Sequence, residues 1–152
     1  MNKRRTLVAG GVVIDRNVNV LVLERDVLRD NGWIHEVRLP KGHVDKDETH
    51  EQCAKREVGE ESGYWNVDII ADLGYDQSEF VFNGEQIIRD EHYFLMQGDA
   101  KQPCKPCPTG EEEAKFKPMW VPIDKAEEMI TYPTEKRFVR RAKAWLQMKK
   151  YI

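Results

Sequence analysis

Cysteine is scarce in this chain, which holds three cysteines in 152 residues. Three thiols cannot all pair with one another, and small domains that depend on disulfides carry a denser cysteine framework. Long apolar runs are also missing, because no stretch approaches the roughly 20 residues that a helix needs to span a bilayer. We therefore expect a cytoplasmic protein whose cysteines remain reduced thiols. We do not expect it to bind a membrane.

An excess of positive charge is absent as well. The chain has 24 Lys and Arg against 27 Asp and Glu, a net charge of −3 and a pI near 5.9. Nucleic acid is therefore not expected as a partner, and a small phosphorylated molecule fits better. The content of 40% hydrophobic and 34% charged residues is typical of a globular chain. Residues 1–152 are enough for a single domain, and nothing in the sequence indicates an oligomeric state.

Turn signals divide the chain into a series of expected strands and two helices. Strand composition covers residues 7–14, 18–23, 33–39, 67–76, 86–96 and 116–123. Asp15-Arg16-Asn17 and Asn83-Gly84 indicate tight turns, so the first two and the fourth and fifth strands are expected to form hairpins. Pro118 and Pro122 in the last strand indicate an edge strand or a strand end. Helices are expected at residues 50–62 and 134–150, so the order predicts an α/β fold with a mixed sheet packed between helices.

The limits of the first expected helix follow from local chemistry. Thr49 can cap the N-terminus, and Gln52 three residues later completes a capping box. Gly63 suits the left-handed position that follows many helix C-termini. These signals predict a helix from His50 to Ser62.

Acidic residues crowd one face of this expected helix. Glu57, Glu60 and Glu61 stand at i, i+3 and i+4, so their side chains project from the same side. Like charges repel at this spacing and lie near the negative end of the helix dipole, and Gly59 costs about 1 kcal/mol relative to alanine. A divalent cation would turn this repulsion into binding, and oxygen ligands suit Mg²⁺ or Mn²⁺. A solvated acidic surface is the alternative.

A longer pattern surrounds these glutamates. It consists of a glycine, five residues, a glutamate, seven residues, and then Arg-Glu-apolar-x-Glu-Glu-x-Gly-apolar, between Gly42 and Tyr64. The pattern resembles the signature of the Nudix hydrolases at every defined position. The resemblance implies a Nudix-like α/β/α sandwich with a mixed central sheet, a catalytic loop–helix–loop and a C-terminal helix. It also implies a hydrolase that cleaves a phosphate–phosphate bond in a nucleoside diphosphate derivative.

The resemblance assigns roles to the matching residues. Glu57, Glu60 and Glu61 would hold the Mg²⁺ or Mn²⁺, and Arg56 would pair with Glu48 and keep the ligand carboxylates in place. A surface ion pair between Arg56 and Glu60 is the alternative for the arginine. The base that activates water is either a motif glutamate such as Glu57 or a carboxylate from elsewhere in the chain.

The residues before the helix bear on the substrate. Gly42 is expected either to allow a close turn of the motif loop or to be an ordinary turn glycine. The lead-in Leu39-Pro40-Lys41-Gly42 resembles that of family members acting on dinucleoside polyphosphates or diphosphoinositol polyphosphates. Arg38 and Lys41 are candidates to bind substrate phosphates, with solvated cations at a strand end as the alternative. A dinucleoside polyphosphate, an ADP-ribose-like compound and a diphosphoinositol polyphosphate all remain possible substrates.

Three features outside the motif have competing interpretations. The run Glu111-Glu112-Glu113 is either an acidic loop surface or the source of a further catalytic carboxylate. Cys104 and Cys107 have the spacing of half a zinc site, but no second half is evident, so a plain loop is favoured. The last expected helix is strongly basic, which favours a solvated face over a site for a polyanion; its cations are Lys136, Arg137, Arg140, Arg141, Lys143, Lys149 and Lys150.

Four aromatic side chains are candidates to contact a nucleobase. Tyr75, Phe80, Phe82 and Tyr93 can stack on a nucleobase, although core packing is expected for most of them.

A non-catalytic nucleotide-binding module of the same fold is one alternative to the enzyme, and RNA decapping is another. The complete set of motif carboxylates favours the enzyme, and the net negative charge opposes a large polyanion as substrate.

Overall fold

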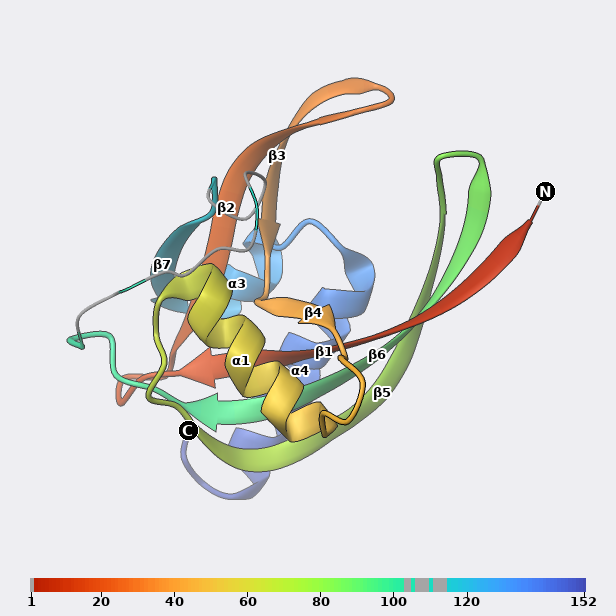
Figure 1. Cartoon of the computed structure of the whole chain (residues 1–152). Helices are drawn as coiled ribbons and strands as arrows, with labels where there is room; N and C mark the ends of the chain where they lie inside the picture. The colour runs from red at the N-terminus through yellow and green to blue at the C-terminus, as the bar shows by residue number, and fades with distance from the viewer. Residues whose placement is uncertain (1, 103–104, 106–109, 111–114) are drawn as a thin grey trace.

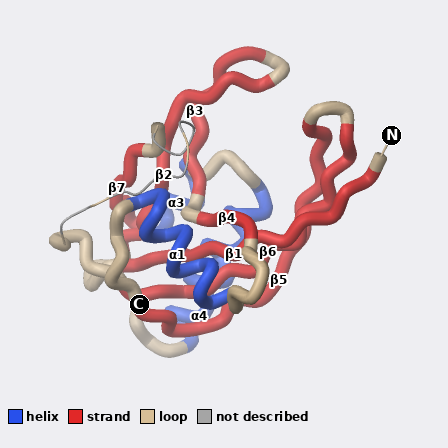
Figure 2. Tube along the Cα trace, viewed as in Figure 1, coloured by secondary structure: helices blue, strands red, loops and turns tan. Residues whose placement is uncertain are grey.

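The computed structural model describes residues 2–102, 105, 110 and 115–152. Within these residues, seven strands form one sheet and three helices cover it (Figure 1, Figure 2). The elements in chain order are β1 (Lys3–Ile14), β2 (Asn19–Arg29), β3 (Gly32–Arg38), β4 (Lys41–His43), α1 (His50–Ser62), β5 (Asp68–Phe82), β6 (Glu85–Gln97), β7 (Lys117–Pro122), α3 (Ile123–Met129) and α4 (Pro133–Met148).

The sheet is mixed, as the sequence predicts. Its main order is β3-β2-β1-β6-β5, with β4 paired to β1 and β7 paired to β2. The long pairing of β1 with β6 is parallel, and the other pairings are antiparallel. The predicted hairpin of β1 and β2 is confirmed at its turn, where Ile14 pairs with Val20. Beyond the turn β1 pairs with β4, while β2 pairs with β7 and β3, so the two strands separate.

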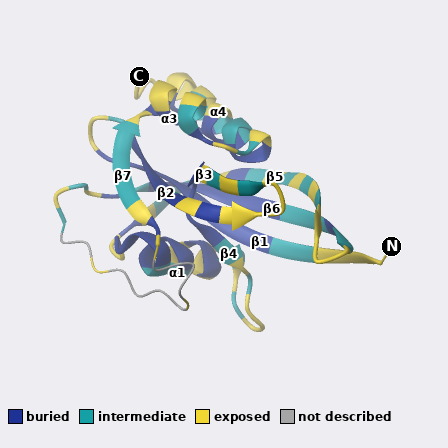
Figure 3. Cartoon of the chain, turned by 90° about the horizontal axis from the view of Figure 1, so that it is seen from above, coloured by how far each residue is buried: buried dark blue, intermediate teal, exposed yellow. Residues whose placement is uncertain are grey.

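Helices cover both faces of the sheet and make an α/β/α sandwich (Figure 3). Helix α1 lies on one face, and α3 and α4 lie on the other. Strand β1 is buried on both sides because its alternate residues belong to different cores. Val13 packs with Val58 of α1, whereas Val12 packs with Phe138 and Leu146 of α4. The continuous apolar run of β1 is therefore explained by two-sided burial.

Two hairpins extend beyond these cores. β2 with β3, and β5 with β6, project on either side of an open region in Figure 1. The β5–β6 hairpin is longer than predicted, since both strands continue to the turn at Asn83 and Gly84. These two residues have φ angles of 49° and 75°, as a two-residue hairpin turn requires. The turn signal was read correctly, but the mixed polar and apolar sequence of residues 77–82 did not indicate a strand.

The motif helix has the predicted limits. Thr49 and Gln52 form the capping box, and Gly63 takes the left-handed conformation at φ 85°. Gly59 has a packing role that offsets its low helix propensity, because a Cβ at this position would lie 2.2 Å from the ring of Trp65.

The C-terminal part of the chain corrects the prediction in two places. β7 is an edge strand, as its prolines indicate, but Ile123 begins α3 and does not end the strand. The short helix α3 and the three-residue strand β4 were not predicted. The last helix begins at Pro133 and ends at Met148, close to the expected 134–150. Within the described residues, no helix is long and apolar enough to cross a membrane.

Candidate active site

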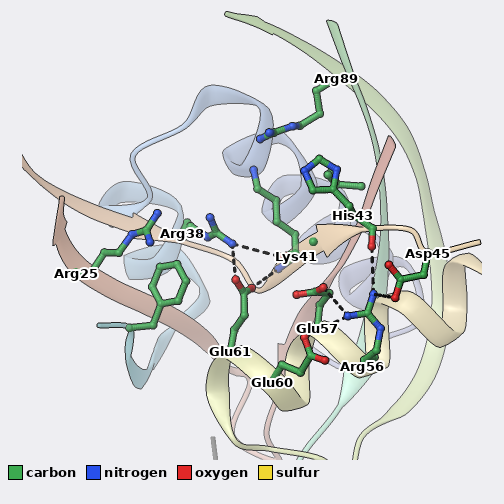
Figure 4. A pocket seen from close by; sticks show the side chains of 13 residues that line it. Arg25, Arg38, Lys41, His43, Asp45, Arg56, Glu57, Glu60, Glu61 and Arg89 are labelled. Carbon is green, nitrogen blue, oxygen red and sulfur yellow. Dashed lines mark hydrogen bonds and ion pairs between the residues drawn. The ribbon is translucent and has the colours of Figure 1, made fainter. Parts of the chain in front are cut away.

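Helix α1 presents its acidic face to a cavity of about 450 Å³. The helix packs on the sheet through Cys53, Ala54 and Val58, which lie beside Glu57 and Glu61 on its buried side, and this packing fixes the rotation of the helix. Glu57 and Glu61 are consequently buried, with 6% and 4% of their surfaces exposed. Figure 4 shows the cavity. Its lining residues are Val8, Arg25, Arg38, Lys41, Gly42, His43, Asp45, Arg56, Glu57, Glu60, Glu61, Arg89 and Phe116.

The loop before α1 meets the helix at Gly42. Gly42 lies in the short strand β4, where it pairs with Ala9 of β1, so the expectation of a turn was wrong. A Cβ at position 42 would lie 2.1 Å from Cδ of Glu57. A glycine is therefore needed here because the Glu57 carboxylate occupies the space of a side chain.

Arg56 connects the carboxylates of the motif. Its Nε and Nη2 donate to the two oxygens of Glu48 at 2.6 and 3.0 Å. Its Nη1 donates to Glu57 at 2.7 Å and to Glu60 at 3.2 Å. The predicted pairing with Glu48 is therefore present, and the alternative pairing with Glu60 occurs as well. The hydrogen bond from Arg56 lowers the pKa of Glu48 to about 2.

Glu61 is held by groups from the strand side of the cavity. Arg38 donates from Nη2 to its Oε2 at 2.8 Å, and the backbone N–H of Lys41 donates to its Oε1 at 2.8 Å. The guanidinium of Arg38 also lies over the ring of Phe116, 4.6 Å from its centre. Arg38 is thus a buried partner of a motif glutamate, and the interpretation as a solvated cation was wrong.

Lys41 is likewise buried and paired. Its Nζ lies 2.9 Å from Glu135 and 3.5 Å from Glu91. Glu135 also accepts a hydrogen bond from the backbone N–H of Leu39 at 2.6 Å, so it joins α4 to the chain segment before the motif. No role in the site was predicted for Glu135 from the sequence. Its signal was its position as a lone acid in the first turn of a basic helix.

The glutamates of α1 lie close together, so their negative charges repel one another. Burial, followed by the nearby Glu61, raises the pKa of Glu57 to about 8, although Arg56 opposes the shift. As they stand, no three His, Cys, Asp or Glu side chains in the described part of the chain converge as a metal site. Glu57 and Glu60 are both paired with Arg56, and Glu61 is paired with Arg38. The all-oxygen donor set and the unfavourable ionisation of Glu57 nevertheless fit a hard divalent cation, which would stabilise the charged carboxylates.

Two further predictions concern the segment with Cys104, Cys107 and the glutamate run, and the basic residues of the last helix. Cys104, Cys107 and the run from Glu111 to Glu113 lie outside the described residues. Four basic residues of α4 form ion pairs: Arg137 and Arg141 with Asp76, Arg140 with Glu127, and Lys143 with Asp124. These contacts support the interpretation as a charged surface.

The four aromatic candidates divide by burial. Tyr93 is fully buried in the core, as expected, but Tyr75 and Phe82 are more than half exposed. Phe80 is half-buried beneath the guanidinium of Arg89. Core packing was therefore correct only for Tyr93. Arg25, Arg89 and Phe116 are lining residues of the cavity that the sequence gave no reason to select, because they come from distant strands and from the segment before β7.

Comparisons with known proteins identify the family. A family model described as the NUDIX domain matches residues 4–142. A Mycobacterium tuberculosis protein named as a mutator protein, MutT4, is 32% identical over 142 residues, which cover 88% of this chain. A Danio rerio oxidized purine nucleoside triphosphate hydrolase is 32% identical over 108 residues, or 64% of this chain. The aligned regions span 53% and 63% of the lengths of these two relatives.

The fold agrees with this match. A crystal structure of a C. elegans Ap4A hydrolase binary complex superimposes with a TM-score of 0.69. It shares 19% sequence identity and covers 94% of this chain and 98% of that structure. The overall fold is therefore shared with this structure. On the family match and the fold together, the chain belongs to the NUDIX domain family.

Proposed function

We propose that this chain is a divalent-metal-dependent hydrolase that cleaves a phosphate–phosphate bond in a nucleoside diphosphate derivative. One observation carries the proposal: three glutamates of α1 face the same cavity as a group of basic side chains from the sheet (Figure 4). The basic side chains suit the phosphates of a substrate, and the glutamates suit the cation that such a reaction needs.

The glutamates and Arg56 form the acidic side of the site. Glu57, Glu60 and Glu61 would hold Mg²⁺ or Mn²⁺, which neutralises phosphoryl charge and makes water nucleophilic near neutral pH. Arg56 donates to Glu57 and Glu60 and is itself held by Glu48, so it restricts the directions in which the carboxylates can turn. Glu57 is our candidate for the base, because it lines the cavity and its carboxylate, once a bound cation stabilises the charged form, can accept a proton from water.

The basic side of the site would position the phosphates. Arg38 contacts Glu61, so a cation bound at Glu61 would weaken this pairing and leave the guanidinium able to donate to a phosphate. Lys41 is not proposed to donate to a phosphate, because its Nζ is paired with Glu135 and Glu91. We propose that Lys41 supports the site through its backbone N–H to Glu61 and contributes its charge to the cavity.

The substrate we propose is a nucleoside polyphosphate, with a dinucleoside polyphosphate or an ADP-ribose-like compound as the specific candidates. The lead-in Leu39-Pro40-Lys41-Gly42 resembles that of enzymes acting on dinucleoside polyphosphates or diphosphoinositol polyphosphates, so it supports a polyphosphate. The names of two similar proteins support the nucleoside: an Ap4A hydrolase and an oxidized purine nucleoside triphosphate hydrolase, which act on nucleoside polyphosphates. A cytoplasmic location is proposed with it, on the cysteine content alone.

A substrate panel tests the proposal. The purified chain is mixed with Mg²⁺ and, separately, with dinucleoside polyphosphates, ADP-ribose, nucleotide sugars, nucleoside triphosphates and diphosphoinositol phosphates, and product release is measured. Turnover of one nucleotide class, with loss of that turnover in Glu60→Gln, is the expected result. Nucleotide binding without any turnover would contradict the enzyme and identify a binding module of the same fold.

A further inference from the structure

Two cavities share a wall in this protein. The first holds the glutamates of α1, and the second, of about 890 Å³, is lined by residues of both projecting hairpins. Arg38, Lys41, His43 and Arg89 line both of them. A ligand that extends from the α1 carboxylates into the second cavity would therefore pass these four side chains.

The cations of the shared wall differ in their partners. Arg38 donates to Glu61, and the Nζ of Lys41 lies 2.9 Å from Glu135. Arg89, in contrast, has no carboxylate within hydrogen-bond or ion-pair distance among the residues that the structure describes. Its Nε, like that of Arg38, is buried with no hydrogen-bond partner. The Glu91 carboxylate is near enough to act on Arg89 through space, but its direct ion pair is with Lys41. Arg89 is thus the cation of the shared wall that is not paired with a carboxylate, so its guanidinium N–H groups can donate to a ligand.

The position of Arg89 is set by its neighbours. Its guanidinium lies over the ring of Phe80, 4.7 Å from the ring centre. The two residues face each other across the β5–β6 hairpin, where Arg89 pairs with Ser78 and Phe80 with Ile87. Burial lowers the pKa of Arg89, although the nearby Glu91 opposes the shift. A guanidinium fixed in this way presents a planar set of donors that matches two oxygens of a phosphate.

The second cavity has the lining that a nucleoside needs. Ile34, Ile87 and the rings of Phe80 and Tyr132 provide apolar and aromatic surface, and Gln77 provides amide donors and an acceptor. Its volume lies within the range of about 300–1,000 Å³ that is common for small-molecule sites.

We propose that Arg89 binds a phosphate of the substrate and directs the attached nucleoside into the second cavity, between the two hairpins. The inference rests on the proposed function and adds the orientation of the substrate in the site. The scissile phosphates lie at the α1 carboxylates, the chain of phosphates passes Arg89, and the nucleoside contacts Phe80. The substrate class is a nucleoside with at least two phosphates.

Calorimetric titration with ADP and with inorganic pyrophosphate, both in EDTA, tests the assignment without any hydrolysis. Arg89→Gln should weaken binding of both probes at least tenfold, because each loses a charge-assisted pair of hydrogen bonds. Arg89→Lys keeps the positive charge but loses the paired donors of the guanidinium. Its affinity for each probe should lie between that of the unaltered chain and that of Arg89→Gln. Phe80→Leu should weaken ADP binding more than pyrophosphate binding, because ADP loses the proposed contact with the nucleoside, whereas pyrophosphate loses only the ring beneath the Arg89 guanidinium. The control is Arg5→Gln, which removes the same charge from an exposed arginine that is paired with Asp90 and lies outside both cavities.

Two results would overturn the assignment. One is a folded Arg89→Gln variant, shown by an unchanged melting temperature, that binds ADP as tightly as the unaltered chain. The other is an unaltered chain that binds neither probe. Because these titrations contain no metal, they are independent of the proposed activity. A chain that binds ADP through Arg89 but hydrolyses nothing in Mg²⁺ would contradict the enzyme and leave the Arg89 assignment standing.

Discussion

The carboxylate of Glu57 occupies the space that a side chain at position 42 would need. The Cβ of any residue other than glycine at position 42 would lie 2.1 Å from Cδ of Glu57. Strand β4 and helix α1 are thereby brought together at the metal-binding face proposed for the helix. The glycine at the start of the motif and the first glutamate of its acidic cluster are therefore a single structural unit, although 15 positions separate Gly42 from Glu57 in the sequence.

Gly42→Ala should consequently displace Glu57 and lower the affinity for Mg²⁺ and the rate of hydrolysis by tenfold or more. The fold should survive, with a loss of about 1–3 kcal/mol in the free energy of unfolding from overpacking. Combining it with Glu57→Ala provides the control, since the added methyl then has room. If Gly42→Ala costs the same stability in both backgrounds, the two residues are not coupled.

Glu48 and Glu60 should differ in their effects although both contact Arg56. Glu60→Gln removes a proposed metal ligand and should lower turnover by orders of magnitude. Glu48→Gln removes a partner of Arg56 and should lower it about tenfold to a hundredfold, the range for groups that support a metal ligand. Turnover and Mg²⁺ affinity of the two variants provide the measurement. Equal losses would contradict the assignment of Glu48 to a supporting role.

Glu135 should matter for stability more than for chemistry. It accepts from Leu39 and pairs with Lys41, and it is fully buried. Glu135→Gln leaves Lys41 with Glu91 alone and should lower the free energy of unfolding by about 1–3 kcal/mol. The exposed Glu128→Gln on α3 is the matched control and should stay within about 0.5 kcal/mol of the unaltered chain. Similar melting curves for both variants would show that the buried pair contributes little.

The predictability of the site divides between local and distant contacts. The limits of α1 could be predicted because Thr49, Gln52 and Gly63 act on their own neighbours. The face of Glu57, Glu60 and Glu61 follows from helical periodicity in the same way. The partners of Lys41 could not be predicted, because Glu135 is 94 residues away in the chain and meets it only through the packing of α4 on the sheet.

The elements that the sequence missed are short or depend on tertiary contacts. Strand β4 has three residues and exists because Gly42 pairs with Ala9 of β1. Helix α3 has seven residues, and no side chain caps its N-terminus, so it lacks the signal that marked α1. The outer part of the β5–β6 hairpin is identified by its pairing register and not by its composition. Long-range pairing therefore accounts for most of what local patterns left undetermined.

The attachment of α4 to the sheet should depend on pH through Asp76. Arg137 and Arg141 both donate to this carboxylate, and the hydrogen bond from Arg137 is the main cause of its lowered pKa. A carboxyl with a lowered folded-state pKa stabilises the fold above its ordinary pKa of 3.8, and this contribution is lost as the pH falls below that value.

Asp76→Asn should therefore cost about 1–2 kcal/mol in the free energy of unfolding at pH 7, and the difference from the unaltered chain should shrink at pH 3. Asp124→Asn serves as the control because its pair with Lys143 is exposed and should contribute at most about 1 kcal/mol. Denaturant unfolding at the two pH values gives the comparison. A difference that persists unchanged at pH 3 would show that the charge of Asp76 is not the cause.

The central claim is that the glutamates of α1 bind a divalent cation on which hydrolysis depends. The most direct test is to measure product release from the best substrate of the panel in Mg²⁺, in excess EDTA, and after Mg²⁺ or Mn²⁺ is restored. We predict that activity disappears in EDTA and returns with either cation. Melting temperature should rise with added cation in the unaltered chain but not in Glu60→Gln, because binding to the folded state stabilises it. Full turnover in excess EDTA would contradict the account.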